Sequence, residues 1–537
     1  LIANMAPIIF ISMVLFLLVG FPVAFALAAN GVVFGLLGIE LGLLGPQLFQ
    51  ALPDRIYGVM ANETLLAVPF FTFMGLVLER SGMAEDLLDT IGQLFGPIRG
   101  GLAYAVIFVG ALLAATTGVV AASVISMGLI SLPIMLRYGY DKRLASGVIA
   151  ASGTLAQIIP PSLVLIVMAD QLGKSVGDMY KGAFIPGLVL TCLYVGYIVA
   201  VSFVRPKWVP ALPPEARIFR EPNGKTGSLS LLVLTALSIT AGIAFGKSRP
   251  DDAPLDEVII IGTMVGIAIP FVMALINRSF KLGLLSHMAE KVTFVLIPPL
   301  GLIFLVLGTI FLGIATPTEG GAMGATGALM MAVLRKRLDL KLLRQAMEST
   351  AKLTTFVVFV LIGARVFSLT FYGVDGHHWV EHLLATLPGG QVGFLIVVNI
   401  LVFLLAFFLD FFELAFIVVP LLGPVAEKLG IDLIWFGVLL GVNMQTSFMH
   451  PPFGFALFFL RSVAPASVKT SDIYWGAIPF VCIQIIMVAL VIAFPQMVTI
   501  GLDKPVEMDI NNVQMELPDT HYDEPSEPPT LELPPAK

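Results

Sequence analysis

The chain has 537 residues, of which 58% are hydrophobic and only 12% are charged, with a formal net charge of -6. Soluble domains are about 45–50% apolar and about 25% charged, so this composition argues against a water-soluble protein. No basic stripe accompanies the charge, which argues against a nucleic-acid partner. Both cysteines, Cys192 and Cys482, lie inside apolar runs and support neither a disulfide framework nor a metal cluster.

Apolar runs long enough to cross a hydrocarbon layer of about 30 Å recur along the chain. They predict an all-α polytopic membrane protein. The first residues lack the cleavage site of a signal peptide, so the first run is expected to be the first span. The expected spans are 7–20, 22–45, 63–80, 145–169, 183–204, 229–246, 257–276, 292–313, 318–335, 352–372, 433–460 and 476–498.

Two further apolar blocks, 101–136 and 391–426, are each long enough for two short helices. Small or polar residues interrupt both near the middle, at Thr116-Thr117-Gly118 and from Asp410 to Glu413. Re-entrant hairpins beside a transport pathway fit this pattern, because non-helical backbone at membrane depth must be buried in protein or line a cavity. A pair of complete spans would also leave both flanks of a block on one side of the membrane. Loop charges therefore do not distinguish a hairpin from two complete spans.

Lys and Arg residues gather in the loops on one side of the expected spans, which predicts that this side is cytoplasmic. The run Arg335-Lys336-Arg337 is the clearest example, whereas the loop 373–390 has no Lys or Arg. We therefore expect 373–390 and both termini to lie in the periplasm, outside a bacterial inner membrane. Residues 503–537 are acidic and rich in proline, which predicts either a disordered, solvated tail or a docking strip for a partner.

Proline, glycine and aspartate residues recur at an offset of 291 residues. The pairs are Pro97 and Pro388, Pro133 and Pro424, Gly139 and Gly430, Asp141 and Asp432, Pro160 and Pro451, and Pro161 and Pro452. They predict two repeats, 1–204 and 292–502, each with five spans and one hairpin. An odd number of spans would invert the second repeat, as in many secondary transporters. Residues 205–291 would then be an inserted polar segment followed by two extra spans.

In each repeat, polar side chains lie a few residues before the paired prolines, where the helix is expected to break. Sodium takes hard oxygen ligands, and a helix unwound by Gly and Pro frees backbone carbonyls for it. The expected sodium ligands are Thr116, Thr117, Gly118, Ser152, Gly153 and Thr154 in the first repeat, and Asp410, Asn443, Gln445, Thr446 and Ser447 in the second. The alternative is that the hydroxyls bond back within their own helices and that the small residues only permit close packing.

Arg365 and Glu413 are candidates for binding substrate. Arg365 lies inside a predicted span and would hold a substrate carboxylate, pair with Asp410 or reach the periplasmic surface. Glu413 and Asp410 are three residues apart and would share one helical face if this segment is helical. They would then bind an ion or act in gating, because intramembrane carboxylates are costly; otherwise they lie in a solvated loop.

Histidines give two further expectations. His450 is the third substrate candidate and would either titrate during transport or pack as a neutral side chain. His377, His378 and His382 have near-ligand spacing, but the sequence joins no Cys or paired acid to them convincingly. No metal site beyond sodium is therefore expected.

Five segments share a pattern with a known family: Arg137-Tyr-Gly-Tyr-Asp-Lys142, Ala151-Ser-Gly-Thr-Leu155, Ile159-Pro-Pro-Ser162, Thr316-Pro-Thr-Glu-Gly-Gly321 and Pro451-Pro-Phe-Gly454. Together they resemble the large membrane subunit (DctM-like) of tripartite ATP-independent periplasmic, or TRAP, transporters, over about 1–200 and 290–500. The resemblance implies an elevator-type carrier with two partners, a small four-span membrane subunit and a periplasmic substrate-binding protein. The extra pair of spans, the Thr-Thr-Gly-Val hairpin tip and His450 depart from the family pattern.

These observations together predict a transporter rather than an enzyme. We expect sodium-coupled secondary active uptake of a small organic acid, with sodium as the only coupling ion and no cofactor. The sequence has no GxxxxGK[ST] motif, which argues against direct use of ATP. No four-span module precedes the first repeat, so a separate small subunit is expected. The alternative is a standalone sodium-carboxylate symporter; an intramembrane hydrolase is disfavoured because HExxH and GxSxG are absent.

Overall fold

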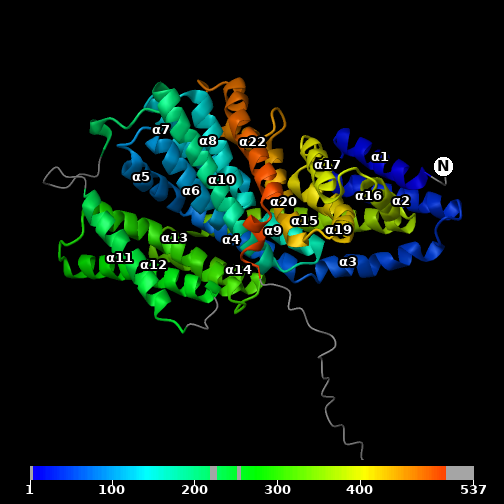
Figure 1. Cartoon of the computed structure of the whole chain (residues 1–537), viewed down its shortest axis with the longest axis horizontal. Helices are drawn as coiled ribbons and strands as arrows, with labels where there is room; N and C mark the ends of the chain where they lie inside the picture. The colour runs from blue at the N-terminus through cyan, green and yellow to red at the C-terminus, as the bar shows by residue number, and fades with distance from the viewer. Residues whose placement is uncertain (1–3, 218–226, 251–254, 503–537) are drawn as a thin grey trace, which may run out of the picture. The chain divides into compact units, whose positions relative to one another are not determined.

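The computed structural model describes residues 4–217, 227–250 and 255–502, and every regular element in these ranges is helical (Figure 1). Up to residue 204 the α-helices are α1 (Met5–Leu18), α2 (Val23–Glu40), α3 (Leu52–Met60), α4 (Ala67–Arg80), α5 (Met83–Phe95), α6 (Gly101–Thr117), α7 (Val120–Arg137), α8 (Lys142–Thr154), α9 (Leu163–Leu172) and α10 (Val176–Val204). The predicted insertion, 205–291, contains α11 (Ser228–Lys247) and α12 (Leu255–Phe280).

The later helices are α13 (His287–Phe311), α14 (Pro317–Leu334), α15 (Leu340–Gly373), α16 (Gly376–Ala385), α17 (Gly390–Leu405), α18 (Phe411–Ile417), α19 (Val419–Lys428), α20 (Leu433–Met444), α21 (Phe455–Val463), α22 (Thr470–Ala493) and α23 (Gln496–Thr499). Short 3-10 helices include η2 (Pro46–Ala51), η3 (Thr64–Leu66), η4 (Leu155–Gln157), η5 (Pro206–Trp208), η6 (Pro214–Ala216) and η7 (Gln445–Phe448). The predicted tail, 503–537, and residues 218–226 of the predicted polar segment lie outside the described residues.

Within the described ranges, eight helices are long and apolar enough to cross a membrane, or nine if the bent pair Pro46–Met60 and Thr64–Arg80 forms one span. The two extra spans predicted at 229–246 and 257–276 correspond to α11 and α12. Helix α15 starts at Leu340, well before the predicted span 352–372, because Asp339 caps it by accepting a hydrogen bond from the Leu342 amide. Hydropathy misses this beginning because it is polar.

Two of the three expected spans that carry adjacent prolines, 145–169 and 433–460, are not continuous helices, whereas Pro298-Pro299 lies inside the continuous helix α13. The first divides into α8, η4 and α9, and the second into α20, η7 and α21. Proline has no backbone N–H and disfavours helical geometry in the residue before it, so each helix ends ahead of the proline pair. Both segments therefore contain a break that leaves backbone carbonyls without helical partners.

The predicted hairpin blocks also divide at the expected places. Helix α6 ends at Gly118, whose φ of 57° is the left-handed conformation that glycine adopts without a steric penalty. In the second block, α17 ends at Leu405 and α18 begins at Phe411. The second arm of this block is interrupted once more at Val418, between α18 and α19, whereas α7 is unbroken.

Helix bounds recur at the 291-residue offset. Shifted by 291, the range of α7 becomes 411–428, which spans the start of α18 to the end of α19, and the start of α8 becomes the start of α20. Gly139 and Gly430 both have positive φ, at 83° and 72°, and each turns the chain just ahead of the next helix. Asp141 and Asp432 then cap α8 and α20 through their side chains.

The predicted cytoplasmic cations hold several helices together. Arg335 and Arg337, at the end of α14, lie 3.2 Å and 3.1 Å from the Asp86 carboxylate on α5. Arg335 also donates to the Phe294 carbonyl on α13 at 3.0 Å. This charged cluster joins α5, α13 and α14 at one end of the helices.

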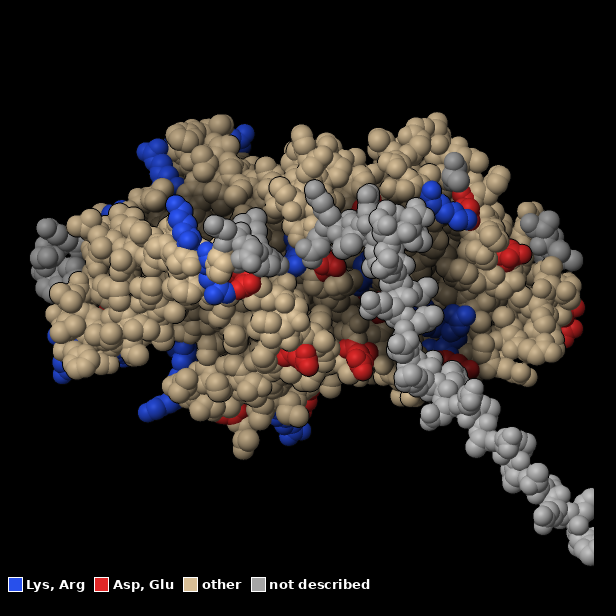
Figure 2. Space-filling view, turned by 60° about the horizontal axis from the view of Figure 1, so that its bottom comes forward, with Lys and Arg blue, Asp and Glu red and all other residues tan. Residues whose placement is uncertain are grey.

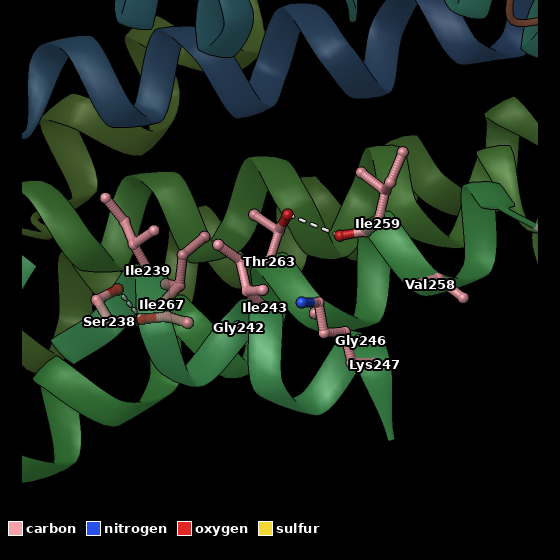
Figure 3. Close-up of a pocket in the computed structure, with 12 residues that line it drawn as sticks. Ser238, Ile239, Gly242, Ile243, Gly246, Lys247, Val258, Ile259, Thr263 and Ile267 are labelled. Atoms are coloured by element: carbon pink, nitrogen blue, oxygen red, sulfur yellow. Dashed lines mark hydrogen bonds between the residues drawn. The ribbon is translucent and has the colours of Figure 1, made fainter. Parts of the chain in front are cut away.

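The extra helices α11 and α12 pack closely against each other (Figure 3). A Cβ atom on Gly242 would lie 2.8 Å from the Gly262 carbonyl oxygen, and one on Gly262 would lie 3.0 Å from that of Gly242. The Ser238 hydroxyl donates to the Gly266 carbonyl across the same interface. Small residues that let helix backbones approach, with a hydroxyl bonding across, are typical of helix pairs in membranes.

The outer surface of these helices is apolar. Leu229, Leu232 and Val233 on α11 are 74%, 66% and 61% exposed. Figure 2 shows one face of the molecule on which Lys, Arg, Asp and Glu form a few scattered groups among uncharged residues. Large exposed apolar surface of this extent is expected where lipid, not water, surrounds the helices.

Candidate ion and substrate sites

The end of α8 is packed tightly against the first hairpin. Ser152 and Thr154 are fully buried, and a Cβ atom on Gly110 of α6 would lie 2.5 Å from the Ser152 Cβ. Gly153 in turn lies against Val124 of α7. Only residues without a side chain fit at these two approaches, so Gly110 and Gly153 bring the hairpin backbone close to the predicted sodium ligands.

The hairpin tip itself contacts the segment after the break. Gly118 lies against the Pro161 carbonyl and the Leu163 side chain, whereas Ser152 lies against Gly110, in the middle of α6. The two helical arms therefore carry the tip past the end of α8. The Thr116 hydroxyl donates to the Leu113 carbonyl at 2.9 Å, and the side chain of Thr117 lies outside the described residues.

A buried polar cluster surrounds the break after α8. Thr154 donates to the Ala151 carbonyl at 2.8 Å and accepts from Gln484 of α22 at 3.3 Å. Among the described residues, the Ser152 hydroxyl, Gln157 Oε1 and Gln484 Oε1 have no hydrogen-bond partner. Unpaired buried oxygens are costly, so this cluster suits a cation or water that would accept their lone pairs.

The second break has its own polar cluster. Asn443 of α20 donates to the backbone carbonyl and side-chain oxygen of Asn399 of α17, at 2.8 Å and 2.9 Å. Thr446 and Ser447 bond back to carbonyls three residues earlier, both at 2.7 Å. Gln445 is fully buried, and neither atom of its amide has a partner in the part of the chain that the structure describes. The second cluster thus also contains an unpaired oxygen beside a helix break.

His450 packs between aromatic rings. Its ring stacks on Phe407 at a centroid distance of 4.1 Å and meets Phe403 edge-on at 4.4 Å. Only 1% of its surface is exposed. Neither ring nitrogen has a hydrogen-bond partner among the described residues.

Asp410 and Glu413 form a capping box at the start of α18. Asp410 accepts from the Glu413 amide and Glu413 accepts from the Asp410 amide, both at 2.8 Å. The condition for a shared helical face, a helical segment, is not met at Asp410, because Asp410 is the extended residue that precedes the helix. Both carboxylates therefore satisfy amides that the first turn of a helix leaves unpaired.

Arg365 and Glu413 line different cavities. Arg365 lies in a cavity of about 540 Å³ whose lining also includes Arg55, Gln171, Ser368 and Tyr372. Glu413 lines a second cavity, of about 350 Å³, between the α1–α2 corner and α15. Within the described residues Arg365 forms no ion pair with Asp410, so that alternative is not observed. The structure does not bring the three substrate candidates together.

The histidines after α15 are joined by an acid that the sequence analysis did not assign to them. Asp375, His377 and His378 hold their ligand atoms within 4.8 Å of one another, whereas His382 is not part of this group in the described chain. Asp375 reaches the histidines because its backbone is left-handed, with φ of 58°. His378 also lies 3.6 Å from Glu381, an ordinary surface ion-pair distance.

Sequence reasoning missed several polar residues at these sites. Gln484, Asn399 and Gln157 lie inside apolar runs, and a polar residue in such a run was the signal that would have found them. Arg55 was not singled out in the sequence. Its place beside Arg365 depends on how α3 packs on α15, which no local pattern encodes.

The long apolar helices, together with shorter helices that end at buried polar clusters, indicate a multi-pass membrane protein. The family model "Tripartite ATP-independent periplasmic transporter, DctM component" matches residues 10–497, so the chain belongs to this family. The resemblance seen in the sequence is thereby confirmed.

Three relatives illustrate the range of the family. The chain is 27% identical over 455 residues to the C4-dicarboxylate TRAP transporter large permease protein DctM of Pseudomonas aeruginosa, covering 84% of this chain and 89% of the relative. It is 26% identical over 510 residues to the protein of the same name from Vibrio cholerae, covering 91% and 95%. The sialic acid TRAP transporter permease protein SiaT of Haemophilus influenzae is 24% identical over 451 residues, which are 84% of this chain and 61% of that longer protein.

Proposed function

We propose that this chain catalyses sodium-coupled uptake of a small organic anion that a periplasmic binding protein delivers. The observation that carries the proposal is the pair of buried polar clusters at the two helix breaks. Each holds unpaired oxygens, on Ser152 and Gln157 in one cluster and on Gln445 in the other. A sodium ion would take up such oxygens together with the carbonyls that the breaks leave free.

The substrate class rests on the relatives. Their names specify C4-dicarboxylates, sialic acid and, for a 22% identical protein of Oleidesulfovibrio alaskensis, isethionate. All three are organic anions, and Arg365 is a cation in a cavity of this chain. An organic anion is therefore the proposed substrate, and a carboxylate is proposed because the C4-dicarboxylates and sialic acid carry one whereas isethionate is a sulfonate.

The transport step would be of the elevator type. The recurrence of helix bounds at 291 residues supports two repeats, 1–204 and 292–502, with inverted orientation and with the hairpins 101–136 and 391–426. In this proposal the hairpins and the broken helices move together and carry the ion clusters across the membrane. Helices α11 and α12 belong to an insertion, 205–291, between the repeats.

Two partners and one location complete the proposal. The family name describes a tripartite periplasmic system, which fits a small four-span membrane subunit and a periplasmic substrate-binding protein. The chain would then reside in the bacterial inner membrane with both termini in the periplasm, since its Lys and Arg gather in the loops that face the cytoplasm.

Uptake into liposomes tests the proposal. The chain is reconstituted with its small subunit, and labelled succinate or sialic acid is supplied with or without the binding protein and an inward sodium gradient. We expect accumulation only when the gradient and the binding protein are both present. Full uptake by the chain without the binding protein would instead support a standalone sodium-carboxylate symporter, and uptake unaffected by sodium would refute the coupling.

A further inference from the structure

A cavity of about 540 Å³ contains two arginines that come from distant parts of the chain. Arg55 lies on α3, and Arg365 lies on α15. The close fit of η2 against α15 brings them together: a Cβ atom on Gly373 would lie 3.4 Å from a methyl carbon of Leu48. Cavities of about 300–1,000 Å³ are typical of small-molecule sites, so this one has room for a small anion.

The two positive charges in this cavity are uncompensated. None of the residues that line it is acidic. Within residues 4–217, 227–250 and 255–502, neither arginine forms a hydrogen bond or an ion pair. Arg365 is half-buried and Arg55 is exposed. A half-buried guanidinium without a counter-charge is unfavourable, so Arg365 favours an anionic partner, and Arg55 places a second positive charge in the same cavity for an anion of charge about -2.

Other polar groups of the cavity are held in place by the surrounding helices. Gln171 of α9 donates to Asp170 at 2.6 Å, and Asp170 also accepts from Asn62 in the corner between α3 and α4. The Tyr372 hydroxyl donates to the Pro420 carbonyl of α19 at 3.2 Å. The cavity thus lies where α3 and α15 meet α9 and α19. Helix α9 follows the first break, and α19 is part of the second hairpin block.

We propose that Arg55 and Arg365 bind a dicarboxylate in this cavity, one carboxylate on each guanidinium, before the anion reaches the helix breaks. Arginine suits this role because its planar fork donates two parallel hydrogen bonds to a carboxylate. The proposal rests on the proposed uptake of organic anions and names the substrate class and the capture site. On the predicted topology, the cavity is nearer the periplasm, where a binding protein would release its ligand.

Thermal unfolding of the purified full-length chain tests this site without requiring transport. Sodium succinate and sodium propionate are titrated at constant total sodium, and the concentration that gives half of the maximal stabilisation is compared. We expect succinate to act at a lower concentration than propionate. Arg55→Gln and Arg365→Gln should each raise the succinate concentration for half-maximal stabilisation by roughly ten- to hundred-fold, because each removes one charge-assisted contact.

Controls separate binding from folding. Arg55→Lys and Arg365→Lys keep the charge and should give smaller increases, and Lys174→Gln, which removes an exposed cation outside the cavity, should leave succinate dependence unchanged. Unchanged succinate dependence in both Gln variants, no stabilisation of the parent by succinate, or equal action of propionate would each overturn the proposal. The two proposals can fail separately. If succinate binding needs both arginines but uptake does not depend on sodium, this site is supported and the proposed sodium coupling is refuted.

Discussion

The Gln484 amide of α22 donates to the Thr154 hydroxyl of α8 at 3.3 Å and to the Tyr194 hydroxyl of α10 at 3.0 Å. One buried side chain therefore joins three helices directly beside the first helix break. These bonds fix the position of the Thr154 oxygen, and they leave Gln484 Oε1 without a partner among the described residues.

Gln484→Met should lower the stability of the protein. The substitution keeps the volume of the side chain but removes both hydrogen bonds, which are worth about 1–2 kcal/mol together in a membrane protein. Thermal unfolding of the purified chain measures the effect. Gln496→Met, at an exposed position on α23, is the matched control and should leave the unfolding temperature unchanged. Equal unfolding temperatures for the two variants would contradict a stabilising role for Gln484.

Ser152→Ala and Thr446→Ala should each lower the apparent affinity of uptake for sodium. Each removes an oxygen from one of the two clusters, and a charge-assisted contact is worth about 1.5–3 kcal/mol. The sodium concentration for half-maximal uptake should therefore rise roughly ten- to hundred-fold. Thr240→Ala is the control, because its hydroxyl bonds back to the Ala236 carbonyl at 2.7 Å on α11, far in sequence from either break. If both cluster variants keep the sodium dependence of the parent, the hydroxyls only pack.

Asp410→Ala should destabilise the protein, whereas Asp410→Asn should not. Asparagine caps a helix about as well as aspartate, while alanine at an N-cap costs about 0.5–2 kcal/mol. Thermal unfolding separates the two variants. A loss of sodium-dependent uptake in Asp410→Asn at full stability would show that the negative charge, and not only the cap, is needed. Identical stability of the Ala and Asn variants would contradict the capping role.

Cysteine labelling tests the predicted sidedness. In a chain with Cys192 and Cys482 replaced by alanine, Asp375→Cys should react with an impermeant reagent in intact cells. Lys341→Cys, at the start of α15, should react only after the membrane is opened, because the positive-inside rule places it in the cytoplasm. Both positions are outside the predicted membrane core, so labelling depends on the side of the membrane. The reverse pattern would invert the whole topology.

The helix breaks were predictable because their causes are local. Pro160-Pro161 and Pro451-Pro452 each follow the end of a helix, and Gly118 permits the left-handed turn at the first tip. A proline pair alone does not decide this, because Pro298-Pro299 lies inside the continuous helix α13. The polar residues ahead of the other two pairs were part of the pattern that predicted the breaks. The beginning of α15 was missed although its Asp339 cap is also local, because hydropathy reports apolar length and not helix capping.

The capping box of Asp410 and Glu413 was overlooked. The two carboxylates were considered only for ion binding, gating or a solvated loop, although an Asp followed three residues later by a Glu is a local signature of this cap.

Contacts between distant segments were not predictable from one sequence. The tip at Gly118 lies against Pro161 because the hairpin arms are long. Arg55 joins Arg365 only because α3 packs on α15. Tertiary packing decides such pairs, and sequence spacing does not contain it.

The close approach of Gly242 to Gly262 bears on what α11 and α12 need from the rest of the molecule. A helix pair that satisfies its own interface needs few contacts with its neighbours, and α11 and α12 find their main further contacts on α13. On the proposed repeat organisation, such a pair could be inserted between the two halves without a change in the packing of either.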